Sequence, residues 1–248
     1  TALAALVMVG IYVGVILHNL DDLERERTEF TELQARKILL SFETHTIRLF
    51  DLADVYLRSA REFALAESPA RMAAFVERVV PPRSELYSST LTLLDHRGHV
   101  SFSTEAGLAQ GTDLSDLPPF LAFKADPADR IVIDTANHST VPDEQYFRVA
   151  RPLLAGGRLA GMAVLDIHSS RIAAFYRDMT LGANSSAAIF SLDRKLIARQ
   201  PAPAADAAPL DALRIWDEVA ARADGKFHKR STLDGVERTY LFKRVSDY

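Results

Sequence analysis

The first 17 residues of the chain carry no charged side chain, whereas residues 21–29 carry seven. As a helix, 17 residues would be about 25 Å long, close to the ~20 residues that cross the hydrocarbon core of a bilayer. The small-residue cleavage site that follows the core of a signal peptide is missing here. The sequence therefore predicts a membrane-spanning helix over residues 1–20. A signal-peptide core and a buried helix are the alternatives.

The composition argues against several classes of function. Acidic and basic side chains are interleaved and the net charge is −4, which does not suit a nucleic-acid-binding surface. Without cysteine, the chain has no disulfide, zinc–thiolate site or cysteine nucleophile. The sequence motifs of hydrolases, zinc proteases and nucleotide-binding loops are missing. His96 and His99 flank a turn with no converging ligands. We expect no catalytic residue, metal or cofactor.

The segment after the apolar run predicts one long stalk helix over residues 21–68. Residues 21–66 contain no glycine or proline, and the helix should reach about 60 Å or more. One seam alternates spacings of three and four, through Leu39, Phe42, Thr46, Leu49, Ala53, Tyr56, Ala60 and Phe63. A second apolar stripe lies beside it, at Leu40, Ile47, Phe50, Leu57 and Ala64.

Two stripes are wider than a two-stranded coiled coil requires. We therefore expect one face of the stalk to pack on the chain's own sheet and the other on a partner helix. The seam predicts a parallel homodimer, with crosslinking through Thr46 or Ala53 preferred over Arg48. The alternative is a helix wholly buried in its own domain.

Beyond the stalk, the hydrophobic period changes between that of helices and that of strands. The first unit is expected to contain a short helix at 69–80, a hairpin at Thr90–Asp95 and Val100–Ser103, a helix at Leu117–Lys124 capped by residues 113–116, a strand at Arg130–Thr135, and a hairpin at Gln145–Leu154 and Leu159–Ile167. A similar order then follows, with a helix at Ser169–Met179, strands at Ser186–Leu192 and Leu196–Arg199, a helix at Leu210–Arg222, and strands at Lys226–Ser231 and Val236–Val245.

This order predicts an α+β fold with two antiparallel-sheet modules. Residues 69–168 would form a membrane-distal sensor module and residues 169–248 a smaller membrane-proximal one. We expect the second module to be incomplete and to lack its last strand.

Four strings in this order resemble the double Cache sensor regions of bacterial transmembrane receptors, whose modules are PAS-like. The strings are LTLLDHRGHVSFST, GTDLSDLPPF, YFRVARPLLAGGRLAGMAVLDI and AAFYRDMTLGANSSAAIFSLDRKLIARQP. The resemblance implies a membrane-proximal dimer with a histidine kinase or diguanylate cyclase as its cytoplasmic output. Residues after about 20 would then lie in the periplasm or outside the cell, held at the bacterial inner membrane.

The chain departs from the family near one proposed ligand contact. Many members have arginine and tyrosine where this chain has Leu117, Pro118 and Pro119, although Phe120 keeps the aromatic position. The arginine–tryptophan–tyrosine cluster of amino-acid-binding members is missing, which argues against an amino acid ligand.

Alternation along residues 145–154 places Tyr146 and Arg148 on one face of the strand. Its other face carries Phe147, Val149, Arg151 and Leu153, which suit the stalk helix. In a PAS-like module Tyr146 and Arg148 would face a small cavity, where an arginine binds a carboxylate bidentately. The alternative is a surface arginine on a solvated strand.

The resemblance also implies that Asp166 faces the ligand; its alternative role is to cap the helix that begins near Ser169. Asp134 and His138 lie in the loop expected to roof the cavity, and Phe120 would close it. With these mixed charges, a zwitterion or small carboxylate fits better than a cation or a sugar. The chain is thus predicted to be the small-molecule sensor region of a membrane receptor. One alternative is a sensor that binds no ligand and responds through rearrangement of its dimer, and another is a membrane-anchored protein-interaction module.

Overall fold

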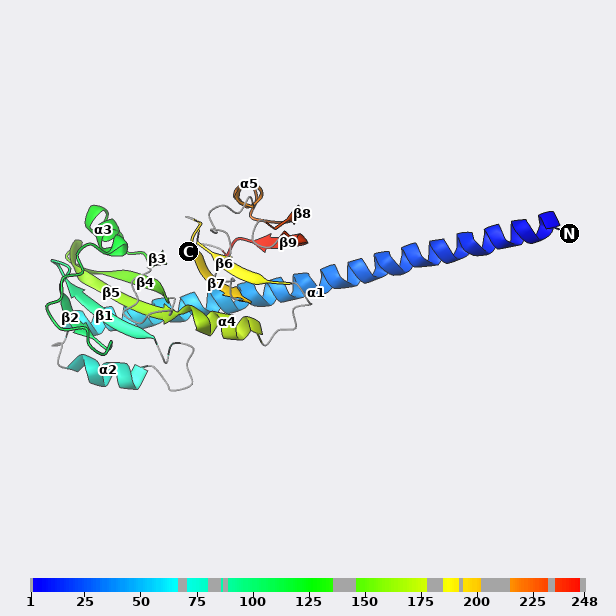
Figure 1. The fold of residues 1–248 in the computed structure, drawn as a ribbon. Coiled ribbons are helices and arrows are strands. Elements are labelled where there is room, and N and C mark those ends of the chain that lie inside the picture. Colours follow the sequence, from blue (N-terminus) through cyan, green and yellow to red (C-terminus); the bar gives the residue numbers. More distant parts are fainter. Residues whose placement is uncertain are drawn as a thin grey trace.

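The computed structural model describes residues 2–66, 71–79, 86, 89–135, 146–177, 185–191, 194–201, 215–231 and 235–245. Side chains before residue 31 lie outside the description. One helix, α1 (Ala2–Ala66), runs for 65 residues without a break and projects far beyond the rest of the molecule (Figure 1). The continuous stalk helix is therefore confirmed, since no proline or glycine interrupts residues 21–66.

In the part of the chain whose side chains are described, no helix is long and apolar enough to cross a membrane. The span predicted for residues 1–20 depends on side chains outside that part, and it stays a prediction.

The main sheet has five antiparallel strands in the order β2-β1-β5-β4-β3. Its strands are β1 (Thr90–Asp95), β2 (Val100–Ser103), β3 (Val132–Asp134), β4 (Tyr146–Ala155) and β5 (Arg158–His168). Both predicted hairpins are present. The β1–β2 turn is closed by Asp95, whose carboxylate accepts hydrogen bonds from the backbone N–H groups of Arg97 and His99.

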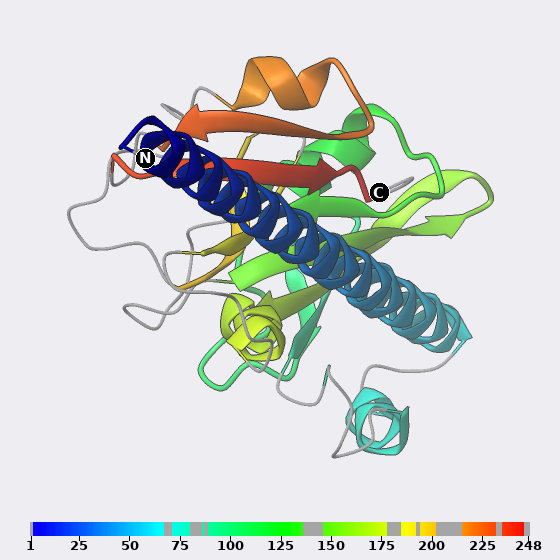
Figure 2. The same ribbon diagram turned by 90° about the vertical axis from the view of Figure 1, so that its right-hand side faces the viewer.

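One face of this sheet packs against the second half of α1, which lies across the strands (Figure 2). Phe147 and Val149 of β4 point to the helix, as the alternation predicts, and the Phe50 and Phe147 ring centroids lie 5.9 Å apart. Arg151 shares this face: its guanidinium is buried and pairs with Asp54 of α1 and with Asp129. Helix α2 (Met72–Val79) adds Phe75, whose ring stacks on Phe63 of α1.

The predicted partner-helix seam is wrong for the middle of α1. Thr46 and Ala53 are 1% and 0% exposed because they pack into the chain's own core. The second stripe is divided: Phe50 and Leu57 are buried, and Leu40 is half exposed. Apolar spacing alone does not reveal whether a stripe meets a sheet or another helix, and here the sheet covers the seam.

A second unit lies along the middle of α1 (Figure 1). It follows α4 (Ser169–Arg177) and contains the hairpins β6 (Ala187–Phe190) with β7 (Leu196–Gln200) and β8 (Asp224–Arg230) with β9 (Glu237–Lys243), together with α5 (Trp216–Ala220). Lys226 Nζ lies 2.5 Å from Glu32 of α1, and Lys243 Nζ lies 2.7 Å from Glu43. These pairs attach the unit to the helix. The boundary at residue 169 and the missing last strand stay predictions.

Candidate functional site

A cavity of about 300 Å³ lies on the face of the main sheet opposite α1. Helix α3 (Pro118–Ala125) and the segment before it cover this face, with Leu117, Phe120 and Phe123 in a small core against β4 and β5. The cavity is lined by Thr92, Glu105, Leu108, Asp113, Leu114, Asp116, Leu117, Pro118, Arg148, Val164 and Asp166.

Strand register brings two ionised side chains together in the cavity wall. Arg148 of β4 pairs with Asp166 of β5 in the ladder, and residues paired in this way point to the same face of a sheet. The guanidinium Nε donates to Asp166 Oδ1 at 2.7 Å, and Nη2 donates to Oδ2 at 3.0 Å. The two side chains are only 10% and 14% exposed. This geometry is the bidentate pair that arginine forms with a carboxylate.

Asp166 stabilises the positive charge of Arg148. Burial acts to lower the pKa of the guanidinium, but the hydrogen bonds and charge of Asp166 outweigh it, with help from the charges of Asp134 and Glu105, so the pKa is raised above its ordinary value. Its Nη1 atom is buried and has no hydrogen-bond partner among the described residues. Arg148 therefore has spare donors beside a cavity.

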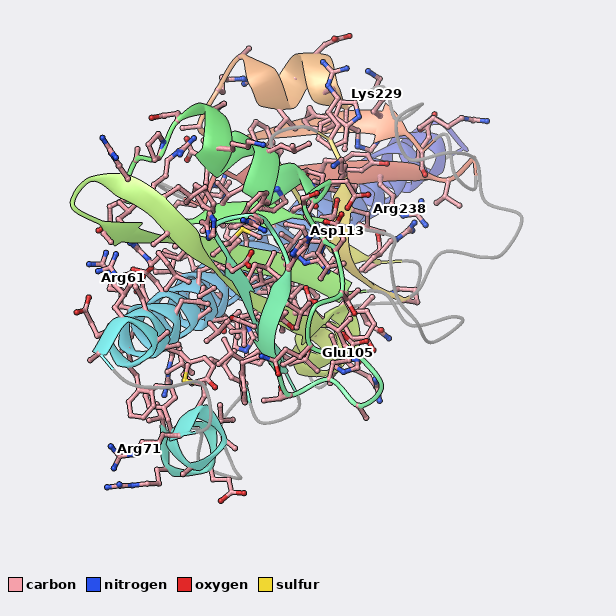
Figure 3. The ribbon with its side chains drawn as sticks, turned by 90° about the vertical axis from the view of Figure 1, so that its left-hand side faces the viewer. Arg61, Arg71, Glu105, Asp113, Lys229 and Arg238 are labelled. Carbon is pink, nitrogen blue, oxygen red and sulfur yellow. The ribbon has the colours of Figure 1, made fainter. Side chains whose placement is uncertain are left out.

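Three further carboxylates line the cavity, Glu105, Asp113 and Asp116. Figure 3 shows Glu105 and Asp113 on the segment between β2 and α3. Asp113 accepts the backbone N–H of Ser115 at 3.0 Å, and this bond holds the pKa of its carboxyl below the ordinary value. The cavity wall thus has four carboxylates and one guanidinium, which favours a ligand with a positive group.

The predicted helix cap at residues 113–116 is wrong. The residue before α3 is Leu117, which makes no side-chain cap hydrogen bond, and proline begins the helix. Proline needs no acceptor for a first-turn N–H, so the helix starts without an acidic cap. The aspartates are instead available to the cavity.

The structure brings together only some of the predicted site residues. Arg148 and Asp166 line the cavity, and both carboxylate oxygens of Asp166 accept hydrogen bonds from Arg148. Phe120 is buried in the core below α3 and is not part of the lining. Tyr146 lies beside His168, 4.3 Å between ring centroids, and is also outside the lining. His138 lies outside the described residues.

Asp134 lies one strand beyond Arg148, and its carboxylate is 5% exposed. It accepts a hydrogen bond from Lys195 Nζ at 3.2 Å. Asp134 is therefore a buried neighbour of the cavity arginine and not a loop residue over the cavity.

Sequence reasoning missed Thr92, Glu105, Asp113 and Asp116 as lining residues. Thr92 could have been found from its alternation with Thr90 and Leu94 on β1, since Thr92 pairs with Val164 on the cavity side. The three acidic residues lie on irregular segments, where no period indicates direction. In the described part of the chain, no group of three histidine or acidic residues is placed to hold a metal ion.

Comparisons with known proteins agree with this architecture. Residues 169–248 match a family described as a histidine kinase sensor domain, dCache_1_like. Among curated proteins, no sequence matches the chain significantly. A solved structure of the extracellular domain of rpHK1S-Z16, named as a histidine kinase, aligns with a TM-score of 0.73 at 23% identity, over 86% of this chain and 88% of that one.

Two chemoreceptor domains have the same fold. The ligand-binding domain of Pseudomonas fluorescens CtaA, solved with L-isoleucine, aligns with a TM-score of 0.59 at 14% identity over 85% of this chain and 84% of that one. The domain of Pseudomonas aeruginosa PctC, solved with GABA, aligns with a TM-score of 0.59 at 16% identity over 85% and 91%. The resemblance to double Cache sensor regions is thereby confirmed: the chain has the fold of extracellular sensor domains of receptors, and its residues 169–248 match the histidine kinase sensor family.

Proposed function

We propose that the chain is the extracytoplasmic sensor region of a membrane receptor and binds a small molecule in the cavity between the main sheet and α3. The observation that carries the proposal is the bidentate Arg148–Asp166 pair in the wall of a cavity of about 300 Å³. That volume suits a small ligand. A cavity with convergent polar groups supports ligand sensing over the alternative of an interaction module without a small ligand.

The preferred ligand class is a zwitterion. Arg148 supplies buried donors for an acceptor group such as a carboxylate, and Asp113, Asp116 and Glu105 favour an ammonium. The related domains of CtaA and PctC were solved with L-isoleucine and GABA, which both combine an ammonium with a carboxylate. Neither tryptophan nor tyrosine is among the described residues that line the cavity, so ligands other than the common amino acids belong in the test.

Signalling would follow from a shift in population. A ligand that binds one arrangement of cavity and helix more tightly than another favours that arrangement. A difference of about 1–3 kcal/mol suffices for a several-fold response. Helix α1 reaches both units and would carry the change to the membrane and to an output domain of the histidine kinase or diguanylate cyclase type.

A thermal-shift screen with amino acids, GABA, other amines and small carboxylates, followed by calorimetry, tests this function. With any ligand found, Arg148→Ala is expected to weaken binding about ten- to hundredfold, since a charge-assisted hydrogen bond contributes ~1.5–3 kcal/mol. Arg148→Lys should recover only part of the affinity, because lysine keeps the positive charge but lacks the planar pair of donors that binds a carboxylate bidentately.

The matched control is Arg158→Ala, which removes an exposed arginine at the far end of the same hairpin. It should bind like the parent. If the parent and Arg148→Ala bind the ligand with equal affinity, the proposal that the ligand binds in this cavity is wrong.

The homodimer remains part of the proposal, but its contact moves to the outward face of α1. Val55 is 60% exposed and Leu40 is 52% exposed, whereas Ala53 is 0% exposed. In membrane-tethered protein at natural density, cysteine at Val55 or Leu40 is expected to form crosslinks at least several-fold faster than cysteine at Ala53. Crosslinking no faster at the two outward sites than at Ala53 would contradict a dimer through this helix.

A further inference from the structure

Four side chains of alternating charge form a row from the cavity to the second unit. Asp166, Arg148 and Asp134 are consecutive partners across β5, β4 and β3. Lys195, from the connection between β6 and β7, closes the row at the edge of the sheet, with its Nζ 3.2 Å from Asp134 Oδ1. The row therefore joins the cavity wall to the hairpin of the other unit, which lies beside the β3 edge (Figure 1).

The middle of the row is incomplete. Arg148 Nη1 and Asp134 Oδ2 are both buried, and neither has a hydrogen-bond partner among the described residues. The two residues are ladder partners on adjacent strands, and they are 8% and 5% exposed. Buried donors and acceptors left without partners are unfavourable. Nη1 is a donor and Oδ2 an acceptor, so a hydrogen bond between them would satisfy both atoms at once.

Asp166 opposes that bond in the present arrangement. It holds Arg148 through Nε and Nη2, which fixes the plane of the guanidinium. Asp134 meanwhile gives its other oxygen to Lys195. If the ammonium of a ligand takes Asp166, the Nε and Nη2 donors of Arg148 become available to the carboxylate of that ligand. The remaining donor, Nη1, then has Asp134, the ladder partner of Arg148, as its neighbouring carboxylate.

We propose that Asp134 couples occupancy of the cavity to the attachment of the β6–β7 hairpin. Lys195 occupies Oδ1 of this carboxylate and Oδ2 is open to Arg148, so the antagonism between the two cations is electrostatic. A closer approach of Arg148 places a second positive charge beside Lys195 and weakens the hold of Asp134 on Lys195. The inference deepens the proposed function and rests on it for the ligand, but the coupling between Arg148 and Lys195 is testable without ligand. Asp134 and Lys195 are thus positioning residues, not ligand contacts.

Asp166→Asn imitates the loss of the bidentate partner, and amide hydrogen exchange of residues 187–190 and 196–200 in ligand-free protein reports the attachment. The variant is expected to raise exchange there by about fivefold or more, the lower end of typical coupling between linked sites. The effect should disappear when Lys195→Ala is already present, because the contact to be weakened is gone. The control Asp116→Asn changes a cavity carboxylate outside the row and should leave this exchange unchanged.

The effect of the hairpin contact on Arg148 is measured without any substitution in the cavity. Lys195 is 49% exposed, so Lys195→Ala leaves the core intact, and it should shift the Nε–H signal of Arg148 in ¹⁵N-arginine spectra. Lys226→Ala, which removes an exposed lysine paired with Glu32, should not.

Three results would each overturn the coupling. One is unchanged amide exchange of the hairpin in Asp166→Asn. The others are an equal rise in exchange with and without the Lys195 side chain, and an Arg148 Nε–H signal that does not shift in Lys195→Ala. A ligand screen without a hit bears on the proposed function alone. These ligand-free measurements bear on the coupling alone.

Discussion

Replacing Gly161 by alanine is expected to destabilise the main sheet by about 3 kcal/mol, the upper end of overpacking in a filled core. Gly161 lies in β5 between β1 and β4, opposite Asp95 and Leu153. A Cβ atom there would lie 2.1 Å from the backbone oxygen of Leu94 and 3.0 Å from Leu153 Cδ1. A side chain can turn away, but a carbonyl of a central strand cannot move without disturbing the ladder.

Urea unfolding followed by circular dichroism measures this effect. Gly157→Ala is the matched control, since Gly157 lies in the turn of the same hairpin with open space around its Cβ position. Its φ of +77° makes alanine unfavourable by only about 1–2 kcal/mol. A Gly161→Ala protein that unfolds at the same urea concentration as the Gly157→Ala protein would contradict the close approach.

Removing Asp54 is expected to destabilise the contact between α1 and the sheet by about 3 kcal/mol. Arg151 is 2% exposed, and its Nε donates to Asp54 Oδ1 at 2.7 Å. Asp54→Ala leaves this buried guanidinium with Asp129, whose side chain is 45% exposed, as its remaining carboxylate among the described residues. Breaking a buried pair by removing one partner costs about 3–5 kcal/mol, and Asp129 places the expected loss at the lower end.

A double-mutant cycle separates two contributions to the loss of stability. One is the missing Arg151–Asp54 ion pair, and the other is the uncompensated buried charge of Arg151. Arg151→Met keeps an unbranched apolar stem in the core and removes the charge that Asp54 compensates. The double variant Asp54→Ala with Arg151→Met should therefore be more stable than Asp54→Ala alone. Strictly additive changes in the free energy of unfolding would show that the two residues do not depend on each other. Asp51→Ala, on the exposed side of α1, is the control and should change stability little.

Local rules explain why the strands could be predicted. The hairpin at Thr90–Asp95 and Val100–Ser103 has the predicted bounds, because a period of two ends at a turn with Gly98 at φ +93°. Alternation also placed Arg148 on the cavity side. These features depend on residues close together in the chain, which is the information that a pattern contains.

The unpredicted features involve partners far apart in the chain. Arg151 was assigned correctly to the helix side, but nothing near it reveals Asp54, which lies 97 residues earlier. Asp134 and Lys195 are 61 residues apart, and a single sequence does not pair them. The two stripes of α1 have the same spacing, whereas their different burial depends on where a sheet built from residues 90–168 comes to lie.

The unbroken helix α1 has a mechanical consequence. Its 65 residues make a rod of about 97 Å at 1.5 Å per residue. Both units contact this helix through ion pairs. The main sheet binds it at Asp54, near its C-terminal end, and the second unit binds it at Glu32 and Glu43. A change in the position of one unit relative to the other would therefore tilt the helix. A tilt of about 5° around the C-terminal end of α1, at Ala66, would displace Ala2 by roughly 8 Å. If the chain signals as proposed, a movement of about one bond length at the cavity end of α1 would thus become a displacement of most of a helix diameter at Ala2.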